Sequence, residues 1–191
     1  MHKFLIRMSM VLTTIGSAAG ATVTFDTLGG VNLDPFTSIT ESGVTVSATT
    51  GSWFKGFNVG NPVPSIVSFT SGTSVTITTG GQFNFLSFDL GTGGLSNPSY
   101  TYHGFLNNVD ILDGSGTPGG NTFVTINNSH PSLLLDKLMI VTTLTATSAN
   151  LDNISILVVP EPNITALLGS GLFLLVLFRG RRRVPPVQVR S

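Results

Sequence analysis

The sequence has no cysteine and few charged residues, and both shortages exclude classes of site. A chain without cysteine forms no disulfide, no thiolate nucleophile and no cysteine-ligated zinc centre. Only 9% of the 191 residues are charged. The charges are also segregated, because both ends are basic whereas residues 22–159 contain eight acidic and two basic side chains, a net charge of −6. A phosphate-binding surface needs clustered lysine and arginine, so we expect no nucleic-acid partner.

Recognisable catalytic motifs are missing too. The G-x-S-x-G sequence of a serine nucleophile does not occur, and neither His103 nor His130 stands at a metal-binding spacing. Glu41 is the only glutamate between residues 22 and 158, and no neighbouring residue marks it as an acid in an apolar pocket. We therefore expect no enzyme activity. The alternative is a pair of carboxylates that the fold brings together for glycoside hydrolysis.

The first 21 residues have the layout of a secretory signal peptide. A short basic start with Lys3 and Arg7 precedes an apolar and small-residue run over residues 8–19. Ala19-Gly20-Ala21 then offers small residues where signal peptidase cuts. The run is short for a membrane span, which favours cleavage over the alternatives of an N-terminal anchor or a buried strand. The prediction is an exported protein, processed by signal peptidase.

The opposite end predicts a single transmembrane helix over residues 164–178, which are apolar or small on all sides. A buried core helix would show a polar face, which this run lacks. A helix of this length reaches roughly 22 Å, short of a hydrocarbon core of about 30 Å, so flanking side chains must snorkel. Basic residues after a span stay in the cytoplasm, which places the central region across the membrane. This membrane-stop cluster consists of Arg179, Arg181, Arg182 and Arg183.

A short proline motif, Pro160-Glu161-Pro162, stands just before the apolar run. The motif, the apolar run and the arginines occur in that order over residues 159–183, which resembles the PEP-CTERM sorting signal of Gram-negative bacteria. The resemblance implies processing by an exosortase, a transient inner-membrane intermediate, and a final place on the outer surface or in an exopolysaccharide matrix of a biofilm. Residues 184–191 depart from the pattern, because they extend past the arginines as a short cytoplasmic tail.

Residues 22–158 are predicted to form one β-rich domain. Threonine, serine, glycine, asparagine, valine and phenylalanine dominate, and no long stretch holds a helical apolar period. Glycine-rich turns separate short alternating runs, which indicates an all-β fold, an antiparallel β-sandwich of jelly-roll type. The expected strands cover residues 22–25, 44–48, 66–69, 75–78, 83–90, 100–106, 109–112, 122–126, 138–147 and 151–158.

One of these runs, residues 83–90, changes its apolar phase by one residue at Leu86. A β-bulge produces such a shift. The phenylalanines of this run are expected in the core, with ligand stacking as the alternative.

The last expected strand, with Asp152 and Asn153 inside residues 149–156, resembles the final strand of jelly rolls of the carbohydrate-binding-module type. That resemblance implies a structural calcium held by Asp152 together with Asp26, since calcium prefers several oxygen ligands. The alternative is that Asp152 only organises the entry to the strand with Asn153.

Three aromatic residues are candidate sugar platforms. Trp53 is the only tryptophan and lies between glycines, and Tyr100 and Tyr102 stand on another expected strand. An aromatic face can stack on the apolar C–H face of a sugar, although a lid over the end of the sandwich explains Trp53 equally well. Two functions remain in view. The first is a structural or adhesive role in the extracellular polysaccharide matrix, and the alternative is a lectin-like module that binds carbohydrate.

Overall fold

The computed structural model describes residues 18–92, 94, 97–144 and 147–160. The first 17 residues of the predicted signal peptide and everything from Glu161 onward lie outside this range. Glu161 and Pro162 of the sorting motif, the predicted transmembrane helix, the arginine cluster and the tail are therefore not described. Within the described ranges, the chain has no helix with the length and apolar character needed to cross a membrane.

Every regular element in the described ranges is a strand, and each pairing is antiparallel, which confirms the all-β antiparallel class. The strands are β1 (Ala19–Val23), β2 (Pro35–Phe36), β3 (Ser38–Glu41), β4 (Val44–Thr50), β5 (Trp53–Gly56), β6 (Ser65–Ser68), β7 (Thr73–Gly91), β8 (Ser99–Leu106), β9 (Val109–Gly116), β10 (Val124–Asn127), β11 (Leu134–Thr143) and β12 (Ala149–Val158).

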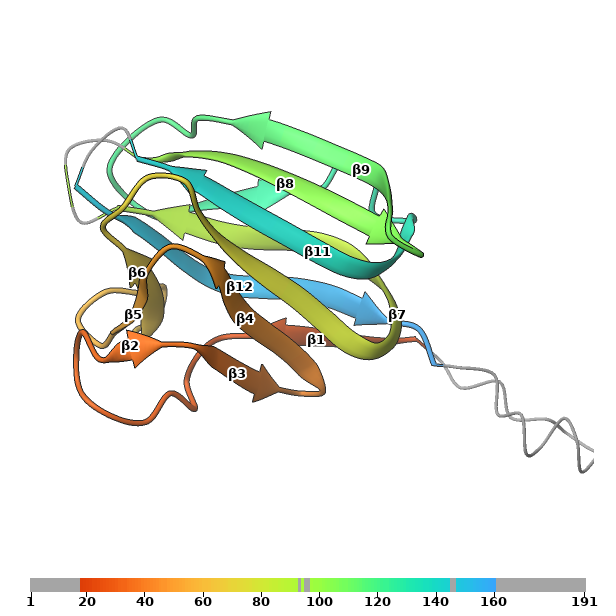
Figure 1. Cartoon of the computed structure of the whole chain (residues 1–191), viewed down its shortest axis with the longest axis horizontal. Coiled ribbons are helices and arrows are strands. Elements are labelled where there is room, and N and C mark those ends of the chain that lie inside the picture. The colour runs from red at the N-terminus through yellow and green to blue at the C-terminus, as the bar shows by residue number, and fades with distance from the viewer. Residues whose placement is uncertain (1–17, 93, 95–96, 145–146, 161–191) are drawn as a thin grey trace, which may run out of the picture. The chain divides into compact units, whose positions relative to one another are not determined.

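The long strand β7 belongs to both layers of the fold (Figure 1). Residues 74–79 pair with β4, and β11 pairs with residues 73–78 and again with residues 83 and 84. This layer continues through β11 to β8 and β9 and through β4 to β3. Residues 83–91 pair with β12 and β10, and this layer continues from β12 to β1, β6, β5 and β2. The change from β4 to β12 falls around Gly80 and Gly81, whose lack of a side chain permits a sharp bend, while β11 stays paired with β7 on both sides of these glycines.

The strand β1 starts at Ala19, three residues before the predicted start of the mature chain. Ala19, Gly20 and Ala21 pair with the end of β12. Cleavage after Ala21 leaves Thr22 and Val23 as the part of this strand that remains on β12.

Apolar side chains from both layers fill the space between them. Phe83, Phe85 and Phe88 of β7 are fully buried, which confirms them as core residues. The expected bulge is present as well: on β12, Ser155 pairs with Ser87 and the next residue pairs with Phe85, so Leu86 is skipped. In a regular strand, Phe85 and Phe88 would point to opposite faces, because they are three residues apart. The extra residue of the bulge changes the alternation, so both side chains face the core.

Candidate functional site

Trp53 is not a sugar platform, and that prediction is wrong. The side chain is only 2% exposed, and its indole Nε1 donates a hydrogen bond to the Ser74 carbonyl oxygen at 3.1 Å. The residue opens β5 instead of lying in a loop, and the pairing of this strand with β2 and β6 turns the indole into the core. With its N–H bonded and its ring enclosed, Trp53 offers no face to a ligand.

Tyr102 is also a core residue, and its prediction as a platform is wrong. It is buried against Phe85 in an edge-to-face contact, with ring centroids 5.3 Å apart. Tyr100 is half-buried and packs edge-to-face on Phe88, with ring centroids 5.5 Å apart. Burial raises the pKa of both tyrosine hydroxyls. These tyrosines therefore take part in the packing between the layers, and sugar stacking by the half-buried Tyr100 stays a prediction.

Glu41 binds the segment that follows β1 through hydrogen bonds to its carboxylate. Its carboxylate accepts backbone N–H groups from Thr24, Phe25 and Thr27 at 2.9 to 3.1 Å, and the Thr27 hydroxyl at 2.6 Å. His103 on β8 bonds Asp110 on β9, with Nδ1 and Oδ2 2.9 Å apart. These polar groups thus bond neighbouring segments of the sheet.

A buried carboxylate pair lies where β12 meets β7. Asp152 and Asp89 are register partners, and both side chains are buried. Asp89 Oδ2 accepts hydrogen bonds from the side-chain amides of Asn61 at 3.2 Å and Asn153 at 2.9 Å, and its Oδ1 accepts the Thr125 hydroxyl at 2.6 Å. These contacts join three strands and the loop between β5 and β6.

Asp152 holds the same loop through the backbone. Its Oδ2 accepts the Asn61 N–H at 2.6 Å, and its Oδ1 accepts the Asn153 N–H at 2.8 Å. Desolvation by burial raises the pKa of Asp152 to about 7, the two N–H donors oppose that rise, and the charges of Asp89 and Asp26 add to it. Asp152 does bond Asn153, as the alternative expected, but it lies inside β12 and not at the entry to the strand.

The oxygens of Asp152 and Asp26, which were predicted to hold calcium, take part in hydrogen bonds within the fold. Both oxygens of Asp152 already accept backbone N–H groups, and Asp26 Oδ2 accepts the Thr24 hydroxyl at 2.9 Å. Among the described residues, no three acidic or histidine side chains gather where they could hold a metal ion. Calcium ligation by Asp26 and Asp152 stays a prediction.

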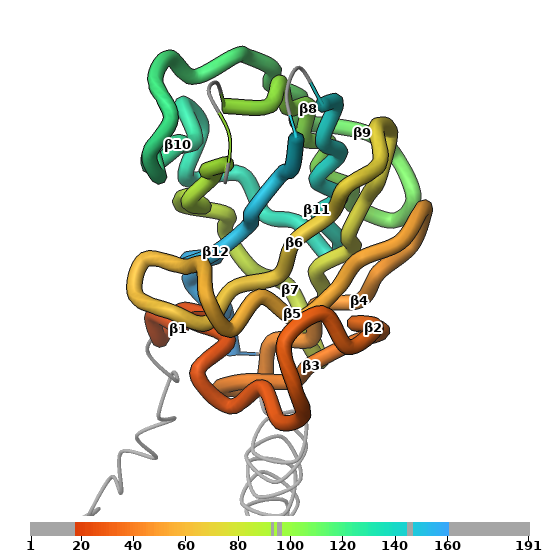
Figure 2. The backbone as a smooth tube through the Cα atoms, turned by 90° about the vertical axis from the view of Figure 1, so that its left-hand side faces the viewer, coloured from red at the N-terminus to blue at the C-terminus, as the bar shows by residue number. Residues whose placement is uncertain are grey.

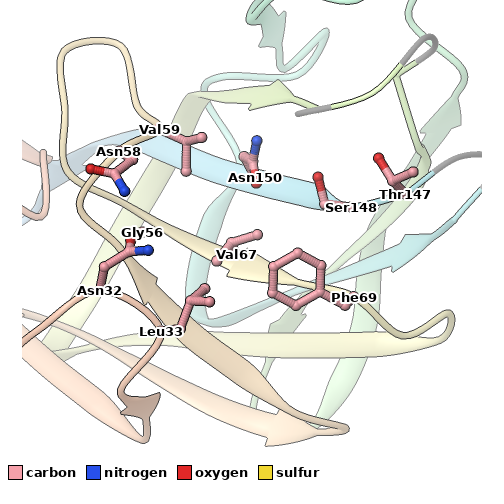
Figure 3. Close-up of a pocket in the computed structure, with 10 residues that line it drawn as sticks. All are labelled: Asn32, Leu33, Gly56, Asn58, Val59, Val67, Phe69, Thr147, Ser148 and Asn150. Atoms are coloured by element: carbon pink, nitrogen blue, oxygen red, sulfur yellow. The ribbon is translucent and has the colours of Figure 1, made fainter.

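A pocket of about 280 Å³ opens beside this network. The loop between β5 and β6, residues 57–64, forms part of its wall, and the start of β12 and the end of β6 form another part (Figure 3). Figure 2 shows the course of the backbone between β5 and β6. All ten lining side chains are uncharged: Asn32, Leu33, Gly56, Asn58, Val59, Val67, Phe69, Thr147, Ser148 and Asn150.

The apolar part of the pocket includes two side chains that the fold leaves in solvent. Phe69 and Leu33 are each 49% exposed. Phe54 lies against the Phe69 ring, with centroids 5.9 Å apart and an interplanar angle of 45°, and this contact holds the ring in place. Figure 3 shows the Phe69 ring next to Val67, with Asn150 on the neighbouring strand β12 and Ser148 just before that strand. An exposed aromatic ring is the feature that was predicted at Trp53.

The polar part of the pocket centres on Asn150. Its side chain is 1% exposed, and neither its amide nitrogen nor its amide oxygen has a hydrogen-bond partner. Buried amides are nearly always satisfied, because an unpaired one costs about 1–3 kcal/mol. Neither Asn150 nor Phe69 was predicted as a site residue from the sequence. The available signal was Asn150 itself, a polar residue two positions from Asp152 in the same strand phase.

No protein-family model matches the sequence, and no curated protein matches it. Solved structures match the fold weakly, and carbohydrate-binding modules are among them. A family 32 module from C. perfringens NanJ, in complex with galactose, is 19% identical, covers 62% of this chain and 98% of its own, and has a TM-score of 0.43.

A mutant of the family 29 module CBM29-2 is 12% identical, with 75% of this chain and all of its own covered and a TM-score of 0.44. A family 32 module of AlyQ, in complex with 4,5-unsaturated mannuronic acid, is 11% identical, with 65% and 98% covered and a TM-score of 0.39. Similarity at this level does not identify a ligand for this chain.

Proposed function

We propose that this chain is an exported, non-catalytic β-sandwich protein that binds carbohydrate through the pocket beside Asn150. The observation that carries the proposal is the buried Asn150 amide, which has two unpaired hydrogen-bonding atoms at a pocket bordered by the half-exposed Phe69 ring. A sugar ring suits this combination, because it presents hydroxyl groups at its edge and an apolar C–H face.

The size of the pocket fits a small unit of a larger chain. Pockets for drug-sized ligands measure roughly 300–1,000 Å³, and this one measures about 280 Å³. Phe69 and Leu33 extend the apolar surface beyond the pocket, where further sugar units of a polysaccharide could lie.

The two ends of the chain supply the cellular context of the proposal. The signal peptide exports the domain, and the sorting segment delivers it through an inner-membrane intermediate and an exosortase to the cell surface or matrix. Binding of the exopolysaccharide there gives the protein an adhesive role. A purely structural surface protein without a sugar ligand is the second candidate, favoured by the large share of aromatic residues that the structure uses for packing.

The test is a binding assay with the purified chain and polysaccharide isolated from the biofilm of the producing cells, with calcium and with chelator. We expect saturable binding that Phe69→Ala weakens about tenfold or more, because the stacking face is removed. Val109→Ala is the matched control, since Val109 is another exposed apolar residue but is not among the residues that line the pocket. Absence of binding under both conditions leaves the structural candidate.

A further inference from the structure

Asn150 differs from two other buried asparagines in the domain. The amide of Asn128 donates to the Phe85 carbonyl at 2.9 Å and accepts the His130 N–H at 3.0 Å, and the amide of Asn84 donates to the Leu133 carbonyl at 2.9 Å. These two side chains link segments of the fold. Asn150 makes no such link, so its burial serves no bond within the described part of the protein.

The position of Asn150 comes from the backbone of β12. Its backbone lies between Val67 of β6 and Gly91 of β7, and Leu151 beside it points into the core. Successive side chains of a strand face opposite sides, so Asn150 and Asp152 share the side that the loop over residues 57–64 covers. Strand pairing therefore holds the unpaired amide at the pocket with little freedom to turn away.

We propose that the pocket takes an uncharged sugar unit and that the Asn150 amide recognises two neighbouring hydroxyl groups of it. This inference rests on the proposed function, which it makes more specific. The Asn150 side chain is only 1% exposed, so the side chains that enclose it must move to admit the sugar. The amide nitrogen then donates to one hydroxyl and the amide oxygen accepts from the next, while Phe69 covers the apolar face of the ring.

Hydrogen-bond chemistry favours hydroxyls over a carboxylate at this place. A hydroxyl donates one hydrogen bond and accepts others, so a neighbouring pair of hydroxyls satisfies the amide nitrogen and the amide oxygen together. An ionised carboxylate only accepts, so it would satisfy the nitrogen and leave the Asn150 oxygen facing another negative oxygen.

The electrostatics of the pocket also favour an uncharged sugar over a uronate. None of its ten lining residues is charged, so a uronate carboxylate would enter without a cation to pair with. Lys55, next to the lining residue Gly56, is already engaged, because its Nζ donates to the Gly29 carbonyl. The net charge of −6 over residues 22–159 adds a repulsion of anionic chains that salt would screen.

The experiment compares binding of the purified full chain to neutral polymers (mannan, galactan and dextran) and to uronate polymers (alginate and polygalacturonate), at low and at high salt. We expect saturable binding to at least one neutral polymer, little change with salt, and competition by the free monosaccharide. Asn150→Leu keeps the branched shape of the side chain without its polar atoms, and we expect it to weaken binding ten- to hundredfold.

Two further variants guard against a loss caused by misfolding. Phe69→Ala changes an exposed residue and should weaken neutral-sugar binding in a domain that unfolds normally. Asn128→Ala removes a buried asparagine that has partners, so it should lower stability while the folded protein keeps its affinity.

The results separate the proposed carbohydrate binding from the more specific inference of an uncharged sugar held by Asn150. Stronger binding to the uronate polymers overturns the uncharged-sugar inference and leaves carbohydrate binding intact. Neutral binding that survives Asn150→Leu overturns the role of this amide. Failure to bind any of the polymers overturns both the inference and the proposed function.

Discussion

Asp152 and Asp89 face each other across β12 and β7, and one residue from a distant loop holds both carboxylates. Asn61 donates its backbone N–H to Asp152 and its side-chain amide to Asp89, across 91 and 28 residues of sequence. Asn58 and Val59 of the same loop line the pocket. The carboxylate pair thus positions one wall of the proposed sugar site.

Asp152 should make the stability of the domain depend on pH. Its folded pKa is about 7, against an ordinary value of 3.8, so the folded state holds the proton more tightly than the unfolded state between these values. The free energy of unfolding therefore falls as pH rises from about 4 to about 7, by on the order of a few kcal/mol, and then levels off. Urea unfolding at pH 5 and pH 8 measures this difference.

The control for the pH effect is Asp152→Asn, which cannot ionise. Its free energy of unfolding should change much less between pH 5 and pH 8 than that of the unmodified chain. An equal pH dependence in both proteins would show that another group is responsible.

Replacement of Asn150 by leucine should stabilise the fold while it removes sugar binding. The variant deletes two unpaired buried polar atoms, which cost about 1–3 kcal/mol, and adds apolar contact with Val67. We expect a gain of about 1 kcal/mol in urea or thermal unfolding. A loss as large as that of Asn128→Ala, which breaks two hydrogen bonds, would mean that Asn150 has a structural partner.

Trp53 should matter for stability and not for sugar binding. Trp53→Ala removes a fully enclosed side chain and should cost about 3–5 kcal/mol. Trp53→Phe should cost less and leave the affinity for the polysaccharide unchanged. Because Trp53 is the only tryptophan, its fluorescence also reports the environment directly. Emission at short wavelength and weak acrylamide quenching are expected, and a strong quenching response would contradict the burial.

The sorting segment predicts how the chain is processed. Glu161→Gln, or deletion of residues 179–183, should leave unprocessed protein in the membrane fraction, because an exosortase would no longer recognise its substrate or the helix would lose its stop. Deletion of residues 184–191 is the control and should not prevent processing. Fractionation followed by immunoblotting measures the outcome, and normal release of either first variant would refute the sorting hypothesis.

Local sequence patterns predicted the class of fold and one irregularity of β7. Alternation of apolar and polar residues reflects the two faces of a strand, so it can be recognised without knowing any partner. The phase shift at Leu86 located a bulge for the same reason, because the bulge changes which side the following residues face. Trp53 failed as a prediction because glycines and aromatic residues around it are equally compatible with an exposed loop and a short buried strand.

By itself, the sequence determined the β-rich composition, the segregation of charge and the expected export and sorting signals, since all of these depend on residues adjacent in the chain. Only the tertiary structure decided which polar side chains meet. Strand pairing places Asn150 beside Val67, and loop closure brings Asn61 onto Asp152 and Asp89. Such contacts depend on register and chain closure over long separations, and neither is encoded in a local pattern.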